Sequence, residues 1–166
     1  MKSNPVLAGL LILVAGYFSA AFAQGLLSGA EWDEPLEISS HQLEVFQEQQ
    51  TSVFSGEVVA RQAQMTLWAD RLTIVFTAEN EIRSIEAAGA VRIEDPLRTA
   101  RAATAVFDRQ ADTLVLSGDA EVTQGENRIS GDEIILYLGE NRSTVRSSET
   151  GRVRALILPD EKVETP

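Results

Sequence analysis

This chain of 166 residues has no cysteine and only one histidine, His41. Without a thiol there can be no disulfide, no thiolate metal ligand and no lipid-modified N-terminal cysteine. With no cysteine and a single histidine, the chain also has few side chains that could form a catalytic nucleophile–base pair. Basic side chains are outnumbered 14 to 25 by acidic ones, and the resulting net charge of −11 would repel a phosphate backbone. We therefore expect no enzyme, no cofactor, no metal site and no nucleic acid partner.

Long apolar runs are also scarce, and the one present lies at the N-terminus. The apolar run Val6–Phe22 follows Lys2. Near its end, Ala21 and Ala23 suit the −3 and −1 positions of a cleavage site before Gln24. A charged start, an apolar middle and small residues at the end are the order of a secretory signal peptide. We predict that residues 1–23 are removed on export. The alternative is an uncleaved membrane anchor, because the run is just long enough to span a bilayer.

The rest of the chain is divided by the hydrophobic pattern. Residues 24–35 have no periodicity and are predicted to be a flexible leader. Residues 36–158 alternate between apolar and polar positions and are predicted to form one domain, followed by a polar tail at 159–166.

A short motif recurs three times at intervals of about 30 residues, which is the sequence signature of a repeat architecture. The three copies are Ser55-Gly56-Glu57-Val58, Ala88-Gly89-Ala90-Val91 and Ser117-Gly118-Asp119-Ala120. Asp70 and Asp132 follow the first and third glycines at the same offset, where the second copy has Ala103. One supersecondary unit is thus expected to stack on itself, which makes a long trough rather than a catalytic pocket.

Apolar residues occupy equivalent positions in each copy, and the positions between them carry polar residues such as Glu57, Arg71 and Glu133. Such alternation over short runs predicts strands with one dry and one wet face, so the expected fold class is all-β, with stacked short antiparallel strands. The predicted inward set is Phe54, Val58, Leu67, Leu72, Ile74, Val91, Ile93, Phe107, Leu116, Val122, Ile129, Ile134 and Leu136.

The alternation slips by one residue at the corners Ala69-Asp70, Ala102-Ala103 and Gly131-Asp132. A step of three in a pleat of period two predicts a bulge or bend there. The glycine before each strand is expected to serve a tight turn or a close backbone approach. Residues 98–105 are rich in helix formers, but their register matches the other copies and we predict a strand.

The candidate catalytic groups all have a simpler structural interpretation. Asp70 and Asp132 could be imagined as an acid/base pair, but equivalent repeat positions favour corner caps that bind backbone amides. His41 occupies the same corner position and is expected to be structural. Trp68 falls outside the inward set, and either a partner anchor or a cover for a neighbouring loop fits it equally well.

The longest run of family-like sequence is Val122-Thr123-Gln124-Gly125-Glu126-Asn127-Arg128-Ile129-Ser130-Gly131-Asp132-Glu133-Ile134-Ile135-Leu136-Tyr137. It resembles the OstA-like domain, and more closely the LptA family of periplasmic lipopolysaccharide transport proteins. The stretches 55–62 and 67–72 resemble the same unit, so the similarity covers about 36–158. Ala103 and the Asp95-Pro96 pair depart from the usual pattern.

The resemblance implies an open, twisted β-jellyroll whose apolar interior receives lipid acyl chains, here through the inward set given above. It also implies lipopolysaccharide as ligand, with inner-membrane LptC-like and outer-membrane LptD-like partners and head-to-tail self-association through sheet edges. The alternatives are an anchored LptC-type component and an exported structural β-repeat protein without a lipid ligand. An envelope glycan enzyme is disfavoured by the shortage of catalytic groups.

Overall fold

The computed structural model describes residues 34–140 and 142–158. The predicted signal peptide, most of the leader and the polar tail therefore lie outside the described residues. The strands are β1 Glu37–Ser39, β2 Gln42–Phe46, β3 Thr51–Gln62, β4 Met65–Phe76, β5 Ile82–Glu94, β6 Arg98–Asp108, β7 Thr113–Gln124, β8 Asn127–Tyr137, β9 Arg142–Arg146 and β10 Arg154–Leu156, with a 3-10 turn, η1, at Leu138–Glu140. No helix in this part of the chain is long and apolar enough to cross a membrane.

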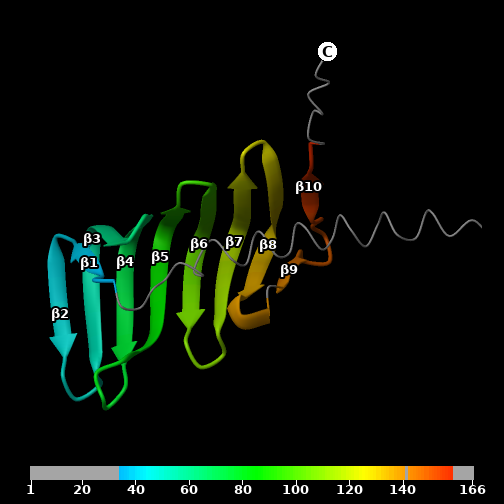
Figure 1. Cartoon of the computed structure of the whole chain (residues 1–166). Coiled ribbons are helices and arrows are strands. Elements are labelled where there is room, and N and C mark those ends of the chain that lie inside the picture. The colour runs from blue at the N-terminus through cyan, green and yellow to red at the C-terminus, as the bar shows by residue number, and fades with distance from the viewer. Residues whose placement is uncertain (1–33, 141, 159–166) are drawn as a thin grey trace, which may run out of the picture.

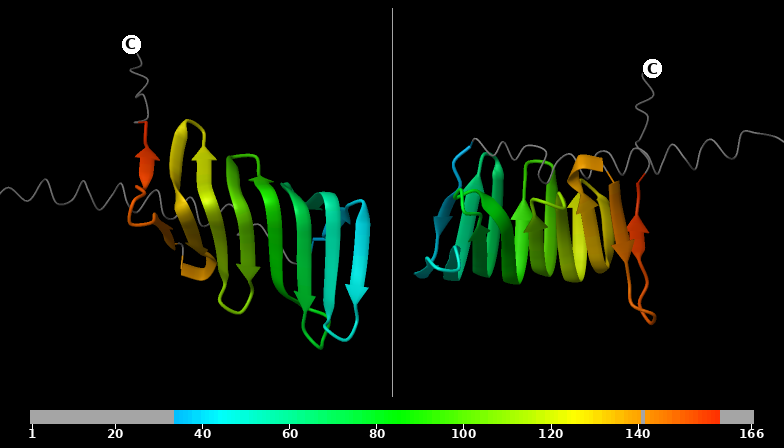
Figure 2. Two further views of the ribbon diagram at one scale, coloured as in Figure 1. Left: turned by 180° about the vertical axis from the view of Figure 1, so that it is seen from behind. Right: turned by 90° about the horizontal axis from the view of Figure 1, so that it is seen from below.

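All the described strands belong to one antiparallel sheet in which β3 to β8 follow their order in the sequence. At the N-terminal end β1 and β2 pair with different halves of β3, and at the C-terminal end β9 and β10 divide β8 in the same way. The sheet therefore advances along the molecule from the N-terminal to the C-terminal end (Figures 1 and 2). It is open at both ends, so the all-β, open jellyroll prediction is confirmed.

Each long strand bends near its middle, and the bend coincides with a bulge. The register of β3 and β4 passes from Ser55↔Arg71 to Val58↔Ala69, so that two residues of β3 oppose one residue of β4. The same irregularity recurs at the other two motif copies. The predicted irregularity at the corners is confirmed, but the extra residue belongs to the strand that carries the glycine.

The motif glycines lie within strands β3, β5 and β7, so the prediction that they precede their strands is wrong. A turn and a bulge both require positive φ, and the sequence pattern of the two is the same. Gly89 has a φ of +83°, and a Cβ added there would lie 2.7 Å from the Cβ of Asp70. Glycine is required at this position both by the backbone conformation and by the close approach of β4.

The bend brings the inner faces of the two halves of each strand into one hydrophobic core. Its most deeply buried large side chains are Leu72, Leu116, Leu136, Val58 and Val122. The helix-favouring segment 98–105 lies in β6, as its register predicted. Strand β9 was not predicted, because Val145 is its only large apolar residue.

Candidate functional site

The inner faces of the bent strands form two apolar walls that enclose a groove along the stack. One wall is built from cross-strand rows such as Leu72–Ala87–Ala105–Leu116–Ile134. The other wall is built from rows such as Ala60–Leu67–Ile93–Ala100–Val122–Ile129. Residues paired across strands share a face of the sheet, so one row extends the same surface through every repeat.

The structure places all thirteen predicted interior residues in this one cluster. Ten are buried, and Phe54, Leu67 and Ile129 are partly buried and pack against the others. Their interior position is therefore confirmed, whereas their contact with a lipid stays a prediction.

A cavity of about 60 Å³ lies between the walls toward the N-terminal end. Its lining consists of Leu36, Ala60, Gln62, Met65, Leu67, Leu72, Ile85, Ala87, Ile93, Ala105, Phe107 and Leu114. Ile85 and Leu114 were absent from the predicted set, although they continue the same alternation four residues before their motif glycines. Leu36 and Met65 were also missed, because they lie outside the repeated positions.

The groove is narrow because alanine dominates its middle. Ala60, Ala87, Ala100 and Ala105 let the walls approach closely, and the larger neighbouring side chains fill most of the space. A cavity of this size holds a few water molecules. The groove therefore has no room for a large apolar ligand unless side chains move, and the strands end at an open seam along it, near Gln62, Arg98 and Gln124.

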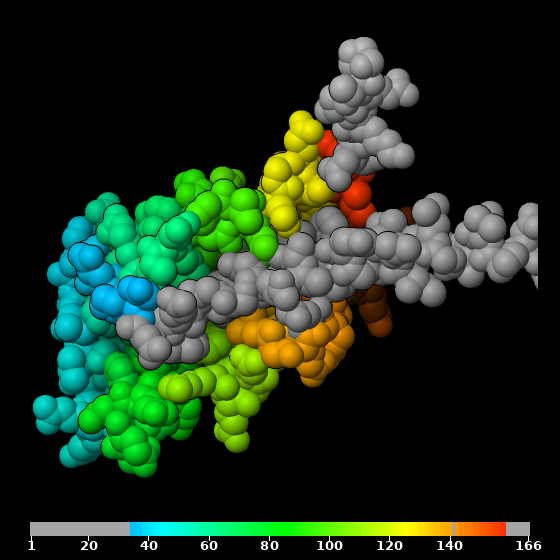
Figure 3. All heavy atoms as spheres, in the orientation of Figure 1, coloured from blue at the N-terminus to red at the C-terminus, as the bar shows by residue number. Residues whose placement is uncertain are grey.

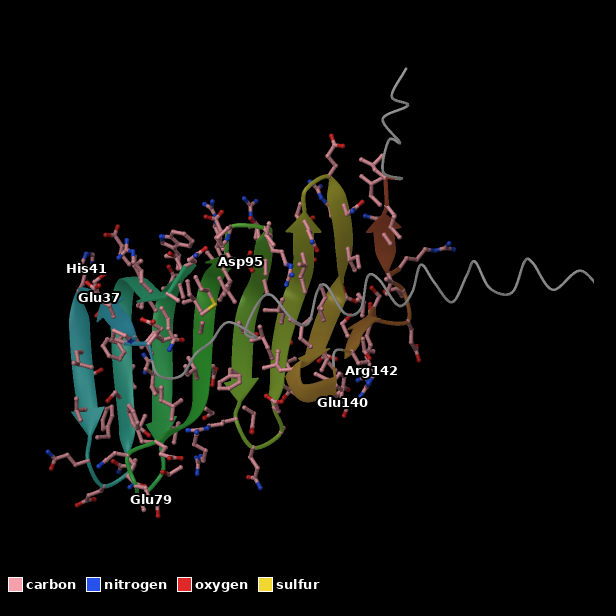
Figure 4. The ribbon with its side chains drawn as sticks, viewed as in Figure 1. Glu37, His41, Glu79, Asp95, Glu140 and Arg142 are labelled. Carbon is pink, nitrogen blue, oxygen red and sulfur yellow. The ribbon has the colours of Figure 1, made fainter. Side chains whose placement is uncertain are left out.

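Polar groups mark the rim of this seam. Gln62 and Arg98 are the buried polar side chains of the described chain, with exposed fractions of 7% and 6%. Burial lowers the pKa of Arg98, and the nearby Asp95 carboxylate opposes that effect. Asp95 also accepts hydrogen bonds from the backbone amides of Leu97 and Arg98, so it fixes the turn between β5 and β6. Figure 4 places Asp95 and Glu79 at opposite ends of the long strands.

Asp132 confirms the predicted cap on a backbone amide, and His41 also makes structural contacts at its corner. Asp132 accepts a hydrogen bond from the Ser148 backbone amide, and this bond lowers the pKa of its carboxyl group. His41 donates its backbone N–H to the Gly56 carbonyl, and its Nε2 lies 3.2 Å from Glu57 Oε2. Asp70 and Asp132 belong to β4 and β8, four strand spacings or about 19 Å apart, too far for an acid/base pair.

The outer face carries exposed ion pairs, each of which contributes little to the stability of the fold. Arg142 pairs with Glu140 at 2.9 Å beside the start of β9 (Figure 4). Trp68 is half-buried, and the guanidinium carbon of Arg92 lies 5.1 Å from the centroid of its ring. Arg92 thus covers part of the aromatic surface that a partner would need. Residues 34–140 and 142–158 contain no group of three acidic or histidine side chains suited to a metal ion.

The geometry can now be compared with known proteins. The family model described as "LptA/(LptD N-terminal domain) LPS transport protein" matches residues 37–142, from β1 to the first residue of β9. This match covers more than half of the chain. The chain belongs to this family. Because the family is one of transport proteins, the assignment agrees with the prediction of a non-enzymatic protein.

Individual relatives are distant but similar along most of their length. The lipopolysaccharide export system protein LptA of Escherichia coli K12 is 21% identical over 158 residues, which span 91% of this chain and 85% of that protein. The LptA of Shigella flexneri matches equally well. The crystal structure of LptH from Pseudomonas aeruginosa, described as the LptA-homologous periplasmic component of the lipopolysaccharide transport device, superposes with a TM-score of 0.67 at 19% identity. The superposition covers 76% of this chain and 97% of the LptH chain, and it confirms the fold.

Proposed function

We propose that this protein is a periplasmic carrier that passes lipopolysaccharide from the inner to the outer membrane, with the acyl chains held in the apolar groove. The observation that carries the proposal is the continuity of the inward rows from β3 to β8. A surface that repeats in register from strand to strand offers a lipid similar surroundings at each step along the stack. The family assignment supports the same function.

The energetics explain why a carrier of this form is needed. Exposing an acyl chain to water costs about 0.8 kcal/mol per methylene, so a twelve-carbon chain opposes free diffusion by roughly 10 kcal/mol. A groove that continued from one subunit into the next would remove most of that barrier. The charged outer face would meanwhile keep the assembly soluble.

The sheet edges are the surfaces through which such continuity would arise. Among the strands that the structure describes, β1 and β2 at one end and β9 and β10 at the other each have a strand neighbour on one side only. An unpaired edge can accept a strand from another chain. We propose that these two edges bind LptC-like inner-membrane and LptD-like outer-membrane proteins, and further copies of this chain head to tail.

Photo-crosslinking in cells tests the carrier. An azidophenylalanine at Phe54 or Phe107 keeps the aromatic ring of the native side chain, adds one small group, and should capture lipopolysaccharide. Glu57 in β3 and Arg71 in β4 point outward from the same region of the sheet and serve as matched controls that should not. Equal labelling at both kinds of position would contradict the carrier and favour a structural repeat protein with a filled core.

A fractionation experiment separates the carrier from an anchored component. Intact-mass measurement of the periplasmic protein should show a chain that begins at Gln24. Recovery only from membranes, with residues 1–23 attached, would favour the LptC-type alternative.

A further inference from the structure

The two ends of the sheet carry opposite charge. Residues 34–48, which include β1 and β2, contain four glutamates and no lysine or arginine. Residues 142–158, which include β9 and β10, contain four arginines and one glutamate. Since the whole chain has a net charge of −11, the cationic C-terminal edge departs from its composition. Figure 4 shows Glu37 and Arg142 at opposite ends of the sheet.

Several of these edge charges lack an opposite charge inside the described part of the chain. Glu37 and Glu44 at the N-terminal edge are exposed and form no ion pair with another described residue. The same is true of Arg152 and Arg154 at the C-terminal edge. These side chains are therefore available to charges on another chain.

Within the sheet, opposite charges do pair between neighbouring strands. Arg146 Nη1 of β9 lies 3.6 Å from Glu133 Oε1, the residue directly opposite on β8. Arg128 of β8 and Glu121 of β7 are diagonal neighbours, and their Nε and Oε2 atoms are 3.7 Å apart. Such cross-strand pairs are favourable, and like charges in the same positions are unfavourable. A strand added at either edge would be subject to the same rule.

A second copy can extend this sheet without changing its antiparallel pattern. β2 is antiparallel to β3, and five further antiparallel pairings lead from β3 to β8. β9 is antiparallel to β8 in turn, so β9 runs opposite to β2. The same count makes β10 run opposite to β1. The N-terminal edge of one copy placed against the C-terminal edge of another is therefore antiparallel in both halves of the bent sheet.

The inner rows select the register of such a contact. One row of paired residues runs from Leu43 of β2 to Val145 of β9. Another row runs from Ile38 of β1 to Ala155 of β10. The contact that continues both rows places Val145 opposite Leu43 of the next copy, and Ala155 opposite Ile38 of the next copy.

This register brings opposite charges together on the outer face. Glu44 follows Leu43, so it lies across from the middle of β9, with Arg142 and Arg146 as its two diagonal neighbours. Glu37 and Arg154 are diagonal neighbours in the other half of the sheet. A guanidinium group carries five N–H donors, so the ion pairs that β9 already makes leave donors for a second carboxylate. A contact between two like edges would instead place glutamates beside glutamates or arginines beside arginines.

We propose that the opposite charges of the two edges determine the order in which copies of this chain associate. The acidic N-terminal edge of one copy binds the arginine-bearing C-terminal edge of the next, and like edges repel each other. Charges on an edge strand ordinarily prevent any association between sheets. Here they exclude the wrong pairs of edges and favour the right one, which is how repulsion produces specificity. The inference rests on the self-association included in the proposed function.

Charge reversal at each edge tests the proposal. The N-edge variant carries Glu37→Arg and Glu44→Arg, and the C-edge variant carries Arg146→Glu and Arg154→Glu. Each should self-associate about tenfold more weakly than the unaltered protein in analytical ultracentrifugation at low salt, because two attractive pairs become repulsive. A mixture of the two variants should regain the association, since every joint between unlike copies again has opposite charges. One protein with all four substitutions should also regain it.

Two controls separate edge charge from other causes. The protein with all four substitutions contains every altered residue, so its recovery would show that neither edge has been damaged. Glu86→Arg with Glu126→Arg makes the same change in net charge as the N-edge variant, at exposed positions of β5 and of the turn after β7, and should leave association unchanged.

Salt gives an independent measurement on the same proteins. At about 1 M salt the Debye length falls to about 3 Å, so charges on neighbouring strands are largely screened. The unaltered protein should associate more weakly than at low salt, and the difference between it and the two edge variants should shrink toward zero. A tenfold difference that persists at high salt would show that the substitutions act through packing, and would overturn the proposal.

The absence of cysteine allows the order and the register to be tested directly. Val45 and Ser143 lie opposite each other in the register that continues the inner rows, so cysteines at these positions come within disulfide distance. Proteins with Val45→Cys and with Ser143→Cys should form a disulfide-linked dimer when mixed under oxidising conditions. Neither protein alone should form one.

The outcomes distinguish this inference from the functions on which it is built. Association that ignores charge reversal, or a disulfide dimer of the Val45→Cys protein alone, would overturn the charge-determined order and leave the carrier function standing. An unaltered protein that stays monomeric at every concentration would overturn the order together with head-to-tail assembly. The cross-linking of lipopolysaccharide at Phe54 and Phe107 decides the carrier function separately, and its failure would leave the result at the edges unchanged.

Discussion

The central strands and edge strands such as β2 have similar alternating sequences but very different surroundings. Strands β3 to β8 are 11 to 13 residues long, and inner side chains such as Leu116 and Leu136 are fully buried. The edge strands have three to five residues, and Leu43, Val45 and Leu156 are 53%, 60% and 55% exposed. Alternation alone therefore does not bury a side chain, which also needs a neighbouring strand on each side.

The chain also forms the bend differently in the central strands and at the edges. In β3, β5 and β7 it is a glycine bulge within a continuous strand. At each edge the chain breaks instead into two short strands, with Ser40 and His41 between β1 and β2. The centre is complete within one chain, whereas the edges expose apolar side chains and backbone groups that another chain could cover. In the space-filling view the N-terminal strands (blue and cyan) lie at one end of the molecule and the C-terminal strands (orange and red) at the other (Figure 3).

The largest contrast is expected from leucine truncation in the two regions. Leu116→Ala should lower the free energy of unfolding by about 2–5 kcal/mol, because it leaves a cavity in the packed centre. Leu156→Ala at the C-terminal edge should change it by less than about 0.5 kcal/mol. Urea titration followed by circular dichroism measures both values. Equal losses would mean that the edges are already covered in solution.

The bulge should be the next most sensitive feature. Gly89→Ala places a Cβ against Asp70 at positive φ and should cost about 1–3 kcal/mol. Gly125→Ala is the matched control, since its φ of +59° is also positive but no atom lies within 4 Å of the new Cβ; it should cost about 1 kcal/mol.

A double variant separates the two causes at the bulge. Asp70→Gly removes the opposing Cβ, so its combination with Gly89→Ala should recover the part of the loss that comes from crowding, while the backbone part should stay. If the double variant is no more stable than the sum of the single variants predicts, crowding by Asp70 is not the cause.

Proline at the edge should affect assembly rather than folding. Backbone N–H groups alternate in direction along a strand, and the Leu158 N–H is bound to Asn127 beside β8. We therefore expect the Ala155 N–H to point outward, so that Ala155→Pro blocks strand addition while β10 stays on β8. Size-exclusion chromatography over a concentration series should show reduced self-association.

The Ile157 N–H points outward by the same alternation, but Ile157 lies beyond β10, which ends at Leu156. Ile157→Pro should therefore weaken self-association less than Ala155→Pro does. Undiminished oligomers of the Ala155→Pro variant would show that this edge is not the contact.

The smallest expected effect concerns the link between β9 and β10. The Ser148 amide holds the pKa of Asp132 below its ordinary value of 3.8. A lowered carboxyl pKa stabilises the folded state fully above pH 3.8, and this contribution is lost as the pH falls through the lower folded value. The protection of the Ser148 amide, measured as its exchange rate relative to an unstructured peptide at the same pH, should fall over that range. Asp132→Asn should make exchange fast at neutral pH, whereas Asp70→Asn should not.

Much of the groove could be predicted because each inward position occurs in three copies. Val58, Val91 and Ala120 are unremarkable singly, but their common offset from a glycine identifies one face of a sheet. The fold class followed from the same register. Positions outside the repeated unit, such as Leu36 and Met65 at the rim, had no second copy to support them.

Two features could not be read from local pattern for physical reasons. The glycine at positive φ suits a turn as well as a bulge, and only the pairing of Ser55 and Val58 with β4 distinguishes them. Strand β9 has a mostly polar sequence, and its pairing with the exposed edge of β8 determines its conformation. Contacts with the rest of the fold determine the conformation of such segments.

The consecutive pairing of β3 to β8 has a consequence for how such a protein can change in length. Because every long strand pairs with its sequence neighbours, one added hairpin would replace a single strand pair with three pairs of the same kind and leave the other pairs unchanged. Each insertion would extend the molecule by about 10 Å at unchanged cross-section. Duplication of one repeat of about 30 residues would thus lengthen the molecule by a fixed amount. The length of one subunit can therefore evolve separately from the ligand specificity of its groove.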